Sequence, residues 1–137
     1  MATASTQIRS VAKNTDGTVL QIPEKSAFRY TADLKKEDGS ALGSGDVSAL
    51  TLTLYNLDAA LTLINGVNGT NILNIGRGTL SAGGALVVVL DALDLALVDA
   101  TKESEKHIAL ITATYAAGAR FMRHEIEHTV VNLQKVS

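Results

Sequence analysis

The chain has 137 residues, a formal charge of −2 at pH 7, and 46% hydrophobic residues, of which only five are aromatic. It contains no cysteine, which excludes disulfides, thiolate chemistry and metal sites with sulfur ligands. The near-neutral charge argues against a nucleic acid or an anionic membrane as partner. The length suits a single domain, whose core must be mainly aliphatic.

The first 17 residues differ from the rest of the chain. They are small and polar, and they lack the apolar segment of a signal peptide. We therefore expect a flexible, extended N-terminal arm over residues 1–17 and a single β-sandwich domain over residues 18–137. The most apolar segment, 85–100, is interrupted by three aspartates and is too short to span a bilayer.

The dominant pattern in the first half is alternation of apolar and polar residues, which is typical of strands with one buried face. TVLQI (18–22) predicts a first strand that ends at Pro23, and AFRYTADLK (27–35) predicts a second. LTLTLY (50–55) follows the same pattern. The intervening segment 36–46 is rich in turn residues and predicts a loop.

The middle of the chain is less regular. Residues 56–78 carry several Asn-Gly and Gly positions among apolar residues, which predicts a long Gly/Asn-rich connection packed onto the domain. ALVVVL (85–90) predicts a strand buried on both faces or nearly so. Asp91 is expected to cap a short helical turn after it.

The last part contains two β-rich runs, 107–115 and 120–133, around the glycine-containing segment 116–119. This arrangement predicts a β-hairpin. Six or seven short strands with turn signals between them favour an antiparallel two-sheet sandwich, with a small closed barrel as the alternative.

The second run of this hairpin contains His124-Glu125-Ile126-Glu127-His128, which fits the H-E-x-x-H signature of zinc metalloproteases. That chemistry requires a helix, because both imidazoles must reach one metal ion. In a strand the two histidines would lie about 13 Å apart. The β-branched residues, the missing caps and the glycine loop before it all favour a strand. The only other histidine is His107.

On such a strand, Arg123, Glu125 and Glu127 would lie on one face. His124 and His128 would lie on the other face, packed in the interior or at an interface. An interface carrying these histidines would respond to pH near 6.

Other catalytic patterns are missing. Gly76-Arg77-Gly78 does not belong to a nucleotide-binding glycine motif, and turn geometry explains it better. Asp91, Asp94 and Asp99 lack the spacing of a calcium loop, which favours capping and solvated-turn roles. No serine lies in G-x-S-x-G. We therefore expect no enzyme activity, no catalytic residue, no cofactor and no metal.

Three segments together resemble a known group of proteins. They are TADLKKEDGSAL (31–42) leading to LTLTLYN (50–56), INGVNGTNILN (64–74), and HIALITATYAAGARFMRHEIEHTVVNL (107–133). The chain resembles small immunoglobulin-like virion structural proteins of tailed bacteriophages and prophages, over about residues 27–134. Similar proteins carry a basic residue at the position of Val67 and an aromatic residue at that of His128.

The resemblance implies an immunoglobulin-like β-sandwich and a structural role in a virion assembled in the host cytoplasm. The implied function is capsid decoration, with many copies bound to the major capsid protein and to one another as a homo-oligomer. A neck or tail position is the alternative, and a host-surface or carbohydrate-binding module is the alternative of another class. Contacts with other virion proteins are expected from the arm, the 56–78 connection and the outer face of the last strand, at Ile8, Arg9, Val11, Asn65, Val67, Asn68, Arg77, Arg123, Glu125 and Glu127.

Overall fold

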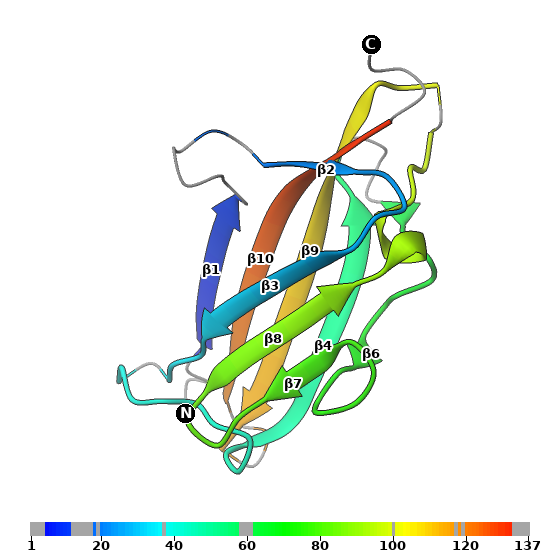
Figure 1. Ribbon diagram of the computed structural model, residues 1–137. Coiled ribbons are helices and arrows are strands. Elements are labelled where there is room, and N and C mark those ends of the chain that lie inside the picture. The colour runs from blue at the N-terminus through cyan, green and yellow to red at the C-terminus, as the bar shows by residue number, and fades with distance from the viewer. Residues whose placement is uncertain are drawn as a thin grey trace.

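The computed structural model describes residues 5–11, 18, 20–36, 38–57, 62–99, 101–116, 118 and 120–132, with the backbone alone for 5–11. This part of the chain consists of strands and one short 3-10 turn (Figure 1). In chain order the elements are β1 (Ser5–Val11), β2 (Gln21–Pro23), β3 (Phe28–Asp33), β4 (Val47–Asn56), β5 (Thr62–Leu63), β6 (Thr70–Asn71), β7 (Gly78–Leu80), β8 (Ala85–Leu90), η1 (Ala92–Leu95), β9 (Ser104–Tyr115) and β10 (Arg120–Val131).

The strands form two sheets, and the smaller one lies across a face of the larger (Figure 1). The seven-stranded sheet has the order β1-β10-β9-β4-β5, with β2 also on β10 and β6 also on β4. The three-stranded sheet has the order β3-β8-β7. The prediction of an all-β chain with two sheets is confirmed. The expectation of purely antiparallel pairing is wrong, because β1 and β2 both run parallel to β10.

The core lies between the two sheets and is mainly aliphatic, as the composition predicts. Alternate residues of β4, β8, β9 and β10 point into it, which follows from the two-residue period of a strand. Each sheet therefore buries one face. The largest fully buried side chains are Leu42, Leu50, Leu52, Leu54, Ile72, Leu86, Leu90, Leu95, Ile108, Ile111, Met122 and Ile126.

The predicted C-terminal hairpin is confirmed. β9 and β10 pair over twelve consecutive positions, from Arg120 opposite Tyr115 to Val131 opposite Ser104. Ala116 and Gly118 in the connecting turn have φ of 54° and 86°, a left-handed conformation that favours a glycine in a short hairpin loop. This hairpin forms the centre of the larger sheet, with β4 on its β9 side.

The edge of β10 opposite β9 carries the N-terminal strands. β1 pairs with it from Ser5 beside Phe121 to Val11 beside Glu127, and β2 continues with Gln21 beside Thr129. Residues 1–4 and 12–17 of the expected arm lie outside the described residues.

Two strand predictions need correction. The strand predicted at 18–22 as the first of the chain is β2 (Gln21–Pro23), which follows β1 (Ser5–Val11). Pro23 belongs to β2, at the sheet edge where a missing N–H costs least. The 85–90 strand is not buried on both faces, because Val87 and Val89 are only half-buried and Ala85 is exposed. β8 belongs to the smaller sheet, and its outer face is not fully covered.

Candidate functional site

The HEIEH segment lies within β10 and is extended, so its predicted strand conformation is confirmed. His124, Ile126 and His128 point into the core, with 9%, 2% and 1% of their surface exposed. Glu125 and Glu127 lie on the opposite, half-buried face, also as predicted. The two imidazoles are therefore separated along one strand and contact different partners.

His124 packs against β3 of the smaller sheet. The Tyr30 hydroxyl lies 2.8 Å from His124 Nδ1 and 3.1 Å from Nε2, and the two rings meet edge to face. Burial raises the pKa of Tyr30 to about 12 and lowers the pKa of His124. Neutral forms of both groups are therefore favoured, which suits a hydrogen bond between the sheets.

His128 lies in a second ring cluster nearer the end of the sandwich. The Phe28 ring of β3 stacks on it with centroids 5.9 Å apart, and His107 of β9 meets it edge-on at 5.8 Å. His107 Nε2 lies 2.9 Å from the Glu105 carboxylate, and both of these side chains are fully buried. The expectation that the β10 histidines are packed in the interior is confirmed.

These ring clusters form no metal centre. Among the described residues, no group of three or more His, Cys, Asp or Glu side chains is placed to hold a metal ion. Glu105 accepts hydrogen bonds from the backbone N–H groups of Val98 and Asp99, at 2.8 and 2.7 Å. Its carboxylate therefore fixes the segment between η1 and β9.

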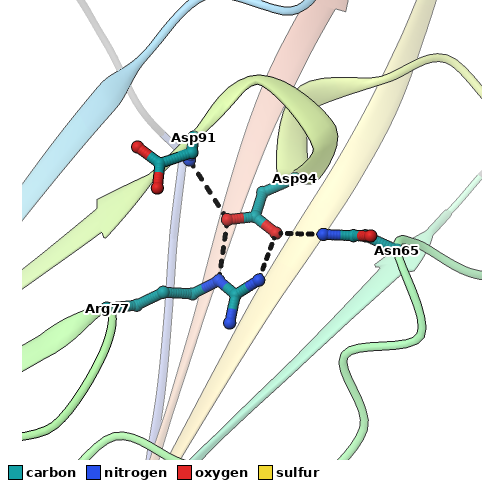
Figure 2. A network of polar contacts seen from close by, with 4 residues as sticks. All are labelled: Asn65, Arg77, Asp91 and Asp94. Carbon is teal, nitrogen blue, oxygen red and sulfur yellow. Dashed lines mark hydrogen bonds and ion pairs between the residues drawn. The ribbon is translucent and has the colours of Figure 1, made fainter.

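A second polar cluster joins three loops around Asp94 (Figure 2). The Arg77 guanidinium donates from Nε to Asp94 Oδ2 at 2.7 Å and from a terminal nitrogen to Oδ1 at 2.8 Å. Asn65 donates to Oδ1 at 3.0 Å, and the backbone N–H of Asp91 donates to Oδ2 at 3.1 Å. One carboxylate thus ties the 62–78 segment to η1.

The electrostatics of this cluster favour the charged carboxylate. The Asp94 side chain is 1% exposed and the Arg77 side chain 25%. Burial alone raises the pKa of Asp94, but hydrogen bonds from Arg77, Asn65 and the Asp91 N–H, together with the Arg77 charge, hold it below its usual value. The expected solvated-turn role of Asp94 is wrong, because the three loops close over it.

The 62–78 segment is also anchored to the core and to β4 by apolar side chains and backbone hydrogen bonds. Ile64, Val67 and Ile72 are buried, and β4 exchanges backbone hydrogen bonds with Ile64 and Val67. The Gly69 N–H donates to the hydroxyl of Thr53 on β4 at 2.9 Å. The segment is therefore packed onto β4 through these residues, and most of its other residues are exposed.

The expected contact residues fall into different environments. Asn68 is exposed at a loop tip, Asn65 and Arg77 contact Asp94, and Val67 belongs to the core, with 3% of its surface exposed. Val67 is therefore not available for partner contact, a correction to its expected role.

On the outer face of β10, Arg123 is exposed and its guanidinium lies 4.7 Å from the centre of the Phe121 ring. Glu125 and Glu127 follow it on the same half-buried face. Of Ile8, Arg9 and Val11, only the backbone in β1 is described. The structure thus separates the expected contacts into a loop group and a β10 group, without bringing them to one site.

Sequence patterns did not indicate the ring clusters or the Asp94 cluster. Tyr30 and His124 are 94 positions apart, and Asn65 and Asp94 are 29 apart. The available sequence signal for the Asp94 cluster was weak. It consisted of Asp94 in the predicted helical turn and Arg77 between two glycines.

The chain matches no protein-family model, and no curated protein sequence is significantly similar to it. In the described part of the chain, no helix has the length and apolar character needed to cross a membrane.

Proposed function

We propose that this chain is a non-enzymatic structural protein of a tailed-phage virion, and that it decorates the capsid by binding the major capsid protein in many copies. The support is the resemblance of three segments to small virion proteins, together with the place of these segments in the fold. Residues 50–56 lie in β4 and residues 107–131 in the β9–β10 hairpin of the larger sheet. Residues 31–33 end β3 of the smaller sheet, and residues 64–74 pack against β4.

The strand arrangement supports the immunoglobulin-like form of the sandwich. In that fold the first, second, fifth and fourth strands form one sheet, and the third, sixth and seventh form the other. Here β3-β8-β7 forms the smaller sheet, and β4, β9 and β10 are neighbours in the larger. When β1, β2, β5 and β6 are set aside, the order of the remaining six strands corresponds; β1 and β2 lie on β10 and not on β3.

The observation that carries the proposal is the construction of the 62–78 loop. It is the segment INGVNGTNILN and its continuation, anchored from inside by buried aliphatic residues and from the side by Asp94. Ile75 is 58% exposed at its surface, and Leu93 on the adjoining turn is 64% exposed. A rigid scaffold that holds exposed apolar loop residues is suited to binding a partner surface.

Weak contacts of this kind become effective when many copies bind one lattice. Each copy then contributes a small free energy, and the particle is held by their number. The neck or tail alternative predicts a closed ring instead.

The test is the stoichiometry of the chain in purified particles, measured by quantitative mass spectrometry against the major capsid protein. We expect on the order of hundreds of copies per particle for capsid decoration and about six or twelve for a ring. Particles that lack the chain altogether would exclude a virion role. Particles assembled without the chain should also rupture more readily under heat or osmotic shock.

A loop variant tests the contact surface. Ile75→Asp places a charge on an exposed loop position and should reduce incorporation into particles at least tenfold, because the charge must be desolvated at the interface. Its unfolding midpoint should stay close to that of the unaltered chain. Thr31→Asp, on the exposed face of β3, is the matched control and should be incorporated normally. Equal incorporation of both variants would show that the 62–78 loop is not part of the contact surface.

A further inference from the structure

The buried imidazoles at one end of the sandwich occupy a continuous row of side chains. Asn56, His107 and His128 are direct neighbours across β4, β9 and β10, and each is at most 1% exposed. Phe28, at the start of β3, covers His128 from the opposite sheet. The contact between the two sheets at this end therefore includes an ionisable ring.

His128 is placed to remain neutral. Neither of its ring nitrogens makes a hydrogen bond of normal geometry to a described residue. A proton added to this ring would put a positive charge in the core with no counter-ion in contact, which is a large desolvation cost.

Among the residues that the structure describes, the neighbouring groups cannot supply that counter-ion. From β9, His128 faces His107, and the Glu105 carboxylate beyond it is already engaged by His107 and two backbone N–H groups. β3 contributes the uncharged ring of Phe28, and the phenol of Tyr30 lies against His124. β4 contributes the uncharged Asn56, and β2, beside β10, carries Gln21, Ile22 and Pro23, which are uncharged.

We propose that His128 and His107 form an acid-sensitive latch that holds the start of β3 against β9 and β10, and that protonation of His128 releases this end of the sandwich. Two adjacent imidazoles that both carry a proton repel each other in a water-poor site. The least costly way to hydrate them is to separate the start of β3 from β9 and β10. The latch does not depend on the proposed virion role.

The expected pH window follows from the ring's environment. Burial first, and His107 second, lower the pKa of His128 to about 4, and the backbone of Ile126 opposes them only in part. Histidine in an unfolded chain has a pKa of about 6.5, so the unfolded state binds the proton more readily. The stabilisation that neutral, buried His128 gives to the folded state is therefore complete above about pH 6.5 and is lost as the pH falls towards 4.

The test combines two measurements on the full chain between pH 7 and pH 4. NMR titration of the three imidazoles should show His128 neutral until the pH nears 4, with its protonation linked to shifts in His107. Hydrogen exchange should show loss of protection in 21–30 and 104–108 before the centre of β4, at 50–54. Over this range the unfolding constant should rise on the order of a hundredfold more than in His128→Phe, which keeps an aromatic ring but cannot be protonated.

His124→Phe is the matched control, because it removes a histidine from the same face but leaves the Phe28–His128–His107 cluster. It should keep most of the acid response. The latch is disproved if His128→Phe responds to acid like the unaltered chain, or if protection is lost evenly over both sheets. Should His128→Phe not fold, the titration of the unaltered chain decides: a His128 that titrates near 6.5 in the folded state overturns the proposal.

Discussion

Asp94→Ala should destabilise the protein by about 2–4 kcal/mol, measured as the free energy of unfolding in urea at pH 7. The substitution removes a carboxylate that accepts hydrogen bonds from Arg77, Asn65 and the N–H of Asp91. Breaking a buried ion pair by removing one partner typically costs about 3–5 kcal/mol. The lower range is expected here because the Arg77 side chain is 25% exposed and can recover some hydration.

The control for this variant is Asp91→Ala in the same turn. Asp91 is exposed and contributes its backbone N–H to the cluster, which alanine retains. Its cost should stay near the ~1 kcal/mol typical of an altered N-cap. A double-mutant cycle with Arg77→Ala should give a coupling of at least about 1 kcal/mol, within the range for direct partners. Additive effects of Arg77→Ala and Asp94→Ala would mean that the ion pair does not anchor the loop.

Gly78→Ala should destabilise the protein by about 1–3 kcal/mol or more, because β7 begins against the 62–78 loop. A Cβ at position 78 would overlap the carbonyl oxygen of Ile72 and lie 2.8 Å from the Ile72 Cβ. Both obstacles lie at or next to the backbone, so no side-chain rotation relieves them. Overpacking of this kind forces backbone shifts with costs in that range.

Gly83→Ala provides a matched comparison in the turn between β7 and β8. A Cβ there would meet only the Ser81 hydroxyl at 3.9 Å, an ordinary contact. Its effect should be within about 0.5 kcal/mol of zero or slightly stabilising, since alanine restricts the unfolded chain. Thermal unfolding of both variants separates steric overlap from the general effect of replacing glycine. Equal midpoints would show that Ile72 can move away at little cost.

Much of the fold could be predicted from local pattern. Alternation in 27–35, 50–55 and 107–133 placed β3, β4 and the C-terminal hairpin, because side chains of a strand alternate between its faces. The strands β1, β5, β6 and β7 were not predicted. The same rule assigned His124 and His128 to one face and Glu125 and Glu127 to the other. Residues 85–90 form the predicted strand, but the prediction that both of its faces are buried was wrong, because an unbroken apolar run does not reveal whether the second face is covered.

The contacts of the candidate site were harder to predict from the sequence. Contacts of the 62–78 segment were expected at Val67 and Arg77, yet Val67 fills the core and Arg77 is turned to Asp94. An apolar residue between two Asn-Gly pairs gives the same local signal whether it points inward or outward. The direction is set by the packing of the loop on β4, which involves residues far away in the chain.

The amino-acid sequence alone determined that the chain is all-β and that its HEIEH segment is extended, because strand periodicity and β-branched residues act within a few positions. Only the tertiary structure decided that β1 and β2 run parallel to β10, that Tyr30 meets His124, and that Asp94 receives Arg77. These contacts join residues 17 to more than 90 positions apart, and they form only when the two sheets and their loops have packed together.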